Sequence, residues 1–261
     1  MKKEQIVAQM YTIRDYLTNL KDFDEACQIL SNIGYTACQL SGWNEQLNIK
    51  EIKKIFDNNN IKCIATHHDC NMTLNEPEKV VEELNILDCD WTAYSYPAGI
   101  SFKTRNQVNN FIERLNKAGK FFFENKKGLC YHNHHIEFVK VNEELVLELI
   151  YNNTNPQYIQ GEIDTYWVQV GGQSVSDWVE RLSGRLPLIH LKDYGVKYNE
   201  SNSIITYITE IGNGNIDWKK VISLAEKGGC QWYIVEQDSC PGNPFDSLKI
   251  SYDYLVNNIC E

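Results

Sequence analysis

Residues 158–191, YIQGEIDTYWVQVGGQSVSDWVERLSGRLPLIHL, contain two short apolar runs separated by a stretch with helical periodicity. The runs cover residues 158–164 and 186–191, and Ser174 precedes the helical stretch, where its hydroxyl can cap the first backbone N–H groups. An apolar strand, a helix and another apolar strand form one unit of a parallel sheet. This stretch therefore predicts an α/β protein.

The same unit repeats along the chain. Further apolar runs occur at residues 6–10, 35–40, 61–66, 91–95, 128–132 and 232–236. Helices are predicted at residues 22–33, 49–59, 77–87, 104–125, 142–152, 174–182, 217–227 and 245–258. Eight sequential units suit a closed barrel better than a doubly wound open sheet, and a barrel of this kind needs about 250 residues. We predict one (β/α)8 TIM-barrel domain over residues 1–261.

The net charge limits the molecules that the protein can bind, and the cysteine content indicates its cellular compartment. The chain carries 35 acidic and 25 basic residues, a formal net charge of −10, which repels nucleic acid and anionic membrane surfaces. No stretch resembles a signal peptide or a transmembrane helix. The nine cysteines are odd in number and form no C-x-x-C pair, as expected for thiols in a reducing compartment. We expect a cytoplasmic protein that binds neither nucleic acid nor membranes.

Histidines gather where the predicted strands end. All six lie at or just after the carboxyl ends of strands: His67, His68, His132, His134, His135 and His190. The active sites of parallel barrels lie at this end, so six histidines there favour a functional site, although a lone histidine would more often be structural. Together with carboxylates they form a mixed N/O donor set suited to Mn, Zn, Co, Mg or Fe(II).

Two carboxylates end apolar strands. Asp164 and Glu236 each end a mostly apolar run that is expected to be buried. Burying an unpaired carboxylate there would cost folding free energy. A metal or substrate contact is the favoured interpretation for both, and a structural salt bridge is the alternative. Glu162 alternates with Asp164 and either points into the barrel core or pairs with Lys192.

Four motifs in fixed order carry a family resemblance. They are Tyr-His-Asn-His at residues 131–134, Asp-Thr-Tyr-Trp-Val at 164–168, His-Leu-Lys-Asp-Tyr at 190–194 and Val-Glu-Gln-Asp at 235–238. With the segments at residues 9–15 and 212–218, they resemble the sugar phosphate isomerase/epimerase family of xylose isomerase-like barrels over nearly the whole chain. The family also includes ketose 3-epimerases, myo-inosose dehydratases and apurinic endonucleases.

The resemblance implies a metal site at the ends of the last four strands. Asp164, His190 and Glu236 match three ligand positions, and His132 stands where ketose epimerases have a glutamate. His134 or Glu137 from the following loop are alternatives to His132. Gln39 on the second strand also departs from the family, which often has glutamate there. The endonuclease branch is disfavoured because Trp167 replaces a ligand histidine and the acidic charge opposes DNA.

The implied activity is metal-dependent isomerisation or epimerisation of a keto- or aldo-sugar through an enolate-type intermediate. The expected acid/base groups are Glu137, His134 and Glu236, with Lys192 supporting the enolate oxygen. The pocket is expected to include Tyr11, His67, His68 and Trp167. Dehydration of an inosose or a 3-keto-sugar at the same site is one alternative, and a non-catalytic sugar-binding barrel is another. A sugar or polyol is the expected partner, and barrels of this kind often form homodimers.

Overall fold

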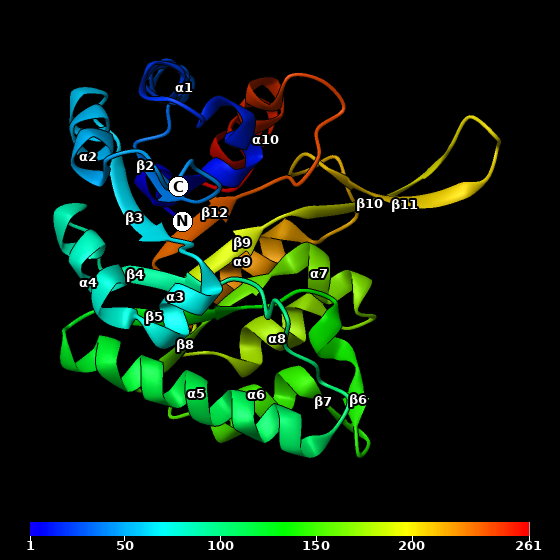
Figure 1. Cartoon of the computed structure of the whole chain (residues 1–261). Coiled ribbons are helices and arrows are strands. Elements are labelled where there is room, and N and C mark those ends of the chain that lie inside the picture. The colour runs from blue at the N-terminus through cyan, green and yellow to red at the C-terminus, as the bar shows by residue number, and fades with distance from the viewer. Residues whose placement is uncertain (261) are drawn as a thin grey trace.

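A closed barrel of eight parallel strands forms the centre of the molecule (Figure 1). The computed structural model describes residues 1–260. The strands are β1 (Ile6–Gln9), β2 (Ala37–Leu40), β3 (Lys62–Thr66), β4 (Trp91–Tyr94), β5 (Gly128–His132), β8 (Ile159–Asp164), β9 (Leu188–Leu191) and β12 (Trp232–Val235). Around the barrel each strand pairs with its neighbours in sequence, and β12 closes onto β1. The predicted TIM-barrel fold is confirmed.

Helices connect the strands on the outside of the barrel. They are α1 (Leu20–Ile33), α2 (Ile49–Asn58), α3 (Cys70–Asn75), α4 (Pro77–Ile86), α5 (Arg105–Glu124), α6 (Val146–Asn153), α7 (Thr165–Val170), α8 (Val175–Arg181), α9 (Trp218–Lys227) and α10 (Pro244–Asn258). Ser174 caps α8 as predicted, accepting a hydrogen bond from the backbone N–H of Asp177. Within residues 1–260, no helix is long and apolar enough to cross a membrane.

Two hairpins interrupt the βα repeat, and the sequence pattern did not predict them. Strand β6 (Lys140–Val141) precedes the helix predicted at residues 142–152, and the following turn and β7 (Glu144–Leu145) occupy its start, so α6 begins only at Val146. Strands β10 (Asp193–Tyr198) and β11 (Ile204–Thr209) form an antiparallel arm that extends away from the barrel (Figure 1, yellow). Both hairpins lie outside the barrel sheet, so the eightfold repeat does not specify them.

The inside of the barrel is layered along its axis. Near the amino ends of the strands it is filled by an apolar cluster of Val7, Ala37, Ile64, Ala65, Ala93, Cys130, Leu188 and Ile234. Because side chains alternate along a strand, the residue two positions beyond an inward-facing one also faces inward. Two positions beyond Val7, Ala37, Cys130 and Leu188 come Gln9, Gln39, His132 and His190. The layer above the apolar cluster is therefore polar.

The hairpin arm is tied to the barrel by one carboxylate. Asp193, which begins β10, accepts hydrogen bonds from the backbone N–H of Gly212 at 2.8 Å and from the indole N–H of Trp218 at 2.7 Å. The backbone N–H of Gly214 also donates to Asp193, at 3.2 Å. A Cβ at position 214 would lie 2.2 Å from Asp193, so glycine is required there. The segment at residues 212–215 is thus a turn that leads into α9.

Candidate metal and sugar site

Four donor residues converge at the carboxyl end of the barrel. His132, Asp164, His190 and Glu236 come from the ends of β5, β8, β9 and β12, and each offers a ligand atom within 4.8 Å of the others. His190 Nδ1 lies 2.7 Å from Glu236 Oε2, and His132 Nε2 lies 3.8 Å from Asp164 Oδ2. All four are buried. The residues that the resemblance implied as ligands are therefore neighbours in the structure.

A second set of donors shares two of these histidines. His67, His132, Glu162 and His190 also offer atoms within 4.8 Å of one another. Glu162 Oε2 lies 2.6 Å from His67 Nε2, 3.3 Å from His132 Nδ1 and 3.5 Å from His190 Nε2. Of the two alternatives for Glu162, the structure shows the one inside the barrel, against the imidazoles. Although burial opposes its charge, His67 and His190 hold the pKa of Glu162 well below its usual range.

Lys192 is buried among three carboxylates. Its Nζ lies 2.9 Å from Asp164 Oδ2, 2.8 Å from Glu236 Oε2 and 3.2 Å from Asp238 Oδ2. Burial disfavours a charged amine, yet these carboxylates outweigh it and raise the pKa of Lys192 well above its ordinary value. The side chain is 1% exposed. The ammonium group thus balances carboxylate charge that would otherwise be buried and unpaired.

The carboxylates near Lys192 differ in their acidity. Burial opposes ionisation of Glu236, but Lys192 and His190 hold the pKa of Glu236 well below its usual range. Burial raises the pKa of Asp164 to about 6, despite the neighbouring Lys192. Both carboxylates are therefore mostly ionised at neutral pH, and Glu236 is the weaker base of the two.

A cavity opens directly above these groups. It has a volume of about 310 Å³ and is lined by Tyr11, Ser41, His67, Ser95, Tyr96, His132, His134, Glu236 and Asp238. Its volume is at the lower end of the range for ligand pockets, which suits a small polar molecule. Trp167 lies beside it, with its ring centroid 5.3 Å from that of His134. Tyr11, His67, His134 and Glu236 thus lie where a pocket was predicted.

His68 and Glu137, both predicted as site residues, do not line the cavity. His68 turns toward α4, with Nε2 3.0 Å from Glu83 and Nδ1 2.8 Å from the Thr66 hydroxyl. Glu137 is buried under the loop after β5, where it accepts hydrogen bonds from the Tyr131 hydroxyl and the His134 backbone N–H, both at 2.8 Å. Burial raises the pKa of Glu137 to about 7. Of the three strand 5 candidates, only His132 belongs to a donor set.

Sequence reasoning assigned no role to three polar residues of the centre. Gln9 and Gln39 are fully buried and hydrogen-bonded to each other, and Asp238 pairs with Lys192. Gln39 was noted only as a departure from the family. Gln9 and Asp238 belong to segments that carry the resemblance, which was the signal that could have identified them.

The chemistry of the converging groups fits a divalent ion. Two imidazoles and two carboxylates form a donor set used for Mn, Fe, Co and Zn, and their mutual distances allow one ion to reach all four. Asp164 Oδ2 also lacks a well-formed hydrogen bond, although it lies 2.9 Å from Lys192 Nζ. This group of side chains could therefore hold a metal ion.

The fold is that of a TIM barrel with a possible metal site at its carboxyl end, and the chain belongs to the xylose isomerase-like TIM barrel family, whose model matches residues 27–255. An inosose dehydratase from Mesomycoplasma hyopneumoniae is 30% identical over 171 residues, 58% of this chain and 55% of that protein. The chain thus matches about half the length of its curated relatives.

Solved structures share the fold over nearly the full length. A sugar phosphate isomerase/epimerase from Parabacteroides distasonis superposes with a TM-score of 0.82 at 22% identity, covering 99% of this chain and 96% of that one. A xylose isomerase-like barrel from Mycobacterium smegmatis in complex with magnesium gives 0.76 at 10% identity, covering 98% and 97%. At these identities the likeness shows the fold alone.

Proposed function

We propose that the protein is a metal-dependent isomerase or epimerase of a keto- or aldo-sugar. The observation that carries this proposal is the convergence of His132, Asp164, His190 and Glu236 within 4.8 Å of one another at the floor of the cavity. The family includes enzymes named as epimerases and dehydratases, which agrees with this chemistry.

The donor set would hold a divalent ion, which supplies Lewis acidity toward a substrate carbonyl and makes the neighbouring C–H more acidic. Glu236 is placed to accept that proton because it lines the cavity and is ionised. Lys192 Nζ, 2.8 Å from Glu236, would stabilise the negative oxygen of the enolate. Return of the proton to the opposite face gives epimerisation, and return to the neighbouring carbon gives isomerisation.

His134 is the candidate for the second proton-transfer group. It lines the cavity, and burial lowers the pKa of His134 to about 2, which keeps the imidazole neutral. A neutral imidazole can pass a proton between two oxygens of a bound sugar. Tyr11 and Tyr96, which both line the cavity, would provide surfaces for the C–H faces of the ring.

Dehydration of an inosose or a 3-keto-sugar is the second candidate. The curated relatives that match this chain are named inosose dehydratases, which favours it. The same removal of a proton beside the carbonyl would be followed by departure of a β-hydroxyl. A group that protonates the departing oxygen is then needed, and Glu236, which lines the cavity and would carry the abstracted proton, could deliver it to that oxygen.

Metal analysis followed by proton exchange tests the proposal. The purified protein is expected to bind about one Mn, Co, Zn or Fe per chain, and to lose it on chelation and in Asp164→Ala and Glu236→Ala variants. The loaded protein is then incubated with keto-sugars and inososes in deuterated water. Deuterium uptake without loss of water supports the isomerase/epimerase, and loss of water supports the dehydratase.

Asp57→Asn, at the other end of the barrel, is the matched control and should leave metal content and exchange unchanged. Metal binding without exchange in any of these substrates, but with saturable sugar binding, would replace the enzyme with a binding protein. No bound metal after reconstitution would contradict both enzymatic candidates.

A further inference from the structure

A buried chain of two glutamine amides connects the backbone after β1 to His190. The backbone N–H of Tyr11 donates to Gln9 Oε1 at 3.4 Å, and Gln9 Nε2 donates to Gln39 Oε1 at 2.9 Å. A backbone N–H is only a donor, so it fixes which end of the Gln9 amide is oxygen. Gln39 Oε1 must then be the acceptor of the Gln9 amide hydrogen.

The contact of Gln39 with Glu162, at the other end of this pair of amides, fixes the orientation of the Gln39 amide independently. Gln39 Nε2 lies 2.6 Å from Glu162 Oε1, and an ionised carboxylate only accepts hydrogen bonds. The imidazole nitrogens around Glu162 Oε2, at 2.6 to 3.5 Å, favour the ionised form. Both anchors therefore orient Gln39 with its nitrogen toward Glu162 and its oxygen toward His190.

This orientation fixes a hydrogen on one particular nitrogen of His190, Nε2. His190 Nε2 lies 2.7 Å from Gln39 Oε1, a distance that requires a hydrogen between the two atoms. The amide oxygen has none to give, so His190 Nε2 is the donor. His190 Nδ1 lies 2.7 Å from Glu236 Oε2, an ionised carboxylate that only accepts, so without a metal Nδ1 carries hydrogen as well. A metal would replace the hydrogen on Nδ1, because Gln39 holds the one on Nε2.

We infer that Gln39 is a positioning residue that keeps the hydrogen of His190 on Nε2 and thereby selects between the two overlapping donor sets. Ligation through Nδ1 places the ion with His132, Asp164 and Glu236, whereas the set with His67 and Glu162 would need the Nε2 lone pair. The layer of Gln9, Gln39, His67 and Glu162 then supports the ligands from below. This inference rests on the proposed metal site and specifies how the chain builds it.

The inferred role of Gln39 also explains why position 39 is a glutamine rather than a glutamate. A glutamate there would place a second carboxylate where the Gln39 amide nitrogen now lies 2.6 Å from Glu162, in a fully buried layer. Two buried like charges at this distance repel each other strongly. Glutamine provides one donor for Glu162 and one acceptor for His190.

The test reads the tautomer of His190 directly. The protein is labelled with ¹⁵N in its histidine rings and loaded with Zn(II), and a long-range ¹H–¹⁵N correlation spectrum is recorded, with His190→Gln to assign the signals. We expect His190 to carry hydrogen on Nε2 and to bind Zn(II) through Nδ1. In Gln39→Met this tautomer should no longer be held, and Zn(II) affinity should fall about 10- to 100-fold.

Two comparisons distinguish a change in the donor set that binds the metal from a general loss of folding. Cys38→Ala changes the neighbouring residue of β2, which faces the helices, and should alter neither the His190 signals nor the affinity. Asp164→Asn should weaken Zn(II) binding more than His67→Ala does. Zn(II) bound through His190 Nε2 in the unmodified protein, or the reverse order of these variants, would overturn the inference while leaving the proposed function intact. Failure to bind Zn(II) at all would overturn both.

Discussion

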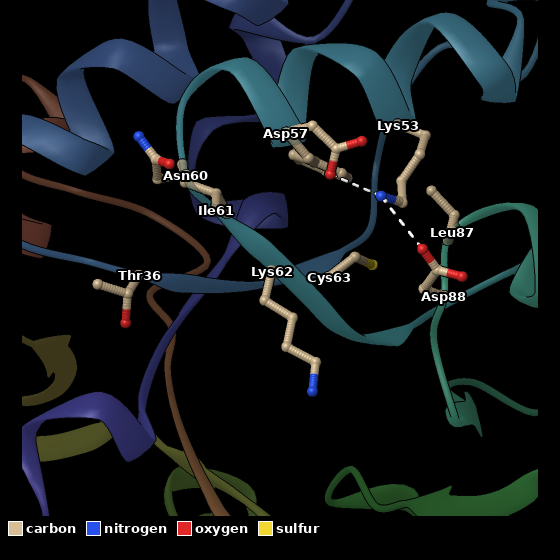
Figure 2. A pocket seen from close by; sticks show the side chains of 10 residues that line it. Thr36, Lys53, Asp57, Asn60, Ile61, Lys62, Cys63, Leu87 and Asp88 are labelled. Atoms are coloured by element: carbon tan, nitrogen blue, oxygen red, sulfur yellow. Dashed lines mark hydrogen bonds and ion pairs between the residues drawn. The ribbon is translucent and has the colours of Figure 1, made fainter.

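The two ends of the barrel both have a cavity, and only one has the organisation of a reactive site. At the amino end, a cavity of about 400 Å³ lies beside α2 and the start of β3 (Figure 2). It is slightly larger than the cavity of about 310 Å³ at the carboxyl end. Cavity volume alone therefore does not distinguish the two ends.

The two ends of the barrel differ instead in how far their lysines and carboxylates are buried. Figure 2 shows Lys53 between Asp57 and Asp88, with Nζ–carboxylate distances of 2.6 and 3.3 Å, similar to those of Lys192. The Lys53 side chain is 22% exposed and Asp88 81%, whereas Lys192 is 1% and Asp164 0% exposed. Water solvates the first cluster and is excluded from the second. Burial of the charges, more than their number, makes the carboxyl end chemically distinctive.

The comparison predicts a large difference in proton transfer between matched carboxylate changes. Glu236→Gln removes the proposed base and should slow solvent deuterium exchange into the substrate by about 10²- to 10⁴-fold. Asp57→Asn, in the amino-end cluster, should leave the exchange rate within twofold. Exchange at an unchanged rate in Glu236→Gln would assign the base to another residue.

A lysine pair extends the comparison to stability. Lys192→Met leaves Asp164, Glu236 and Asp238 without their buried cation, so the metal-free protein should lose about 3–5 kcal/mol of unfolding free energy in urea titrations. Lys62→Met, at the exposed amino-end position labelled in Figure 2, should change it by less than about 0.5 kcal/mol.

Zn(II) should restore more stability to Lys192→Met than it adds to the unmodified protein, because the ion replaces the missing positive charge. Equal stabilisation of both proteins would show that Lys192 does not share the carboxylates with the ion.

Glu137 provides a pH-dependent difference at the carboxyl end. Burial raises the pKa of Glu137 from 4.5 to about 7, so the folded protein retains a proton that the unfolded chain releases. Its contribution to stability is therefore present below pH 4.5 and is lost as the pH rises to about 7, by about 2–3 kcal/mol.

The Glu137→Gln variant has no carboxyl to titrate at this position, so its stability should lack the Glu137-dependent fall between pH 4.5 and about 7. The difference in unfolding free energy between the variant and the unmodified protein should therefore change across that pH range. Urea titrations at several pH values measure it. A difference that is independent of pH would contradict the raised pKa.

The smallest effect is expected in the solvated cluster. Lys53→Met removes both contacts with Asp57 and Asp88, yet exposed ion pairs contribute only about 0–1 kcal/mol. The thermal midpoint should fall slightly, and the effect should shrink further at high salt because exposed charges are screened. A loss comparable to that of Lys192→Met would show that burial does not separate the two clusters.

The barrel was predictable because each of its strands buries both faces. Runs such as residues 186–191 are apolar except for one histidine, and their spacing repeats eight times along the chain. The β10–β11 arm was not predictable by the same rule. Its residues alternate between exposed and partly buried, as in Ile204–Thr209, and its register depends on pairing across a turn rather than on the core.

The site was predictable where a charged residue ends an apolar strand, as at Asp164 and Glu236. It was not predictable where the partner comes from a distant strand. The contact between Gln39 and Glu162 spans 123 residues and exists only because the barrel closes. The direction of a side chain in a loop was also beyond the sequence, so His68 and Glu137 were grouped with residues whose cavity they do not line.

The hydrogen bonds of Asp193 separate changes in the β10–β11 arm from the site residues in the barrel. One carboxylate joins the first residue of β10 to the turn after β11, so the chain leaves the barrel and returns at almost the same point. The length of the arm can then change without moving Lys192, which lies one residue before the junction. This makes the arm tip, near Asn199–Asn202, a natural place to insert a peptide or a reporter domain, and a place where related chains can diverge without altering the chemistry of the barrel.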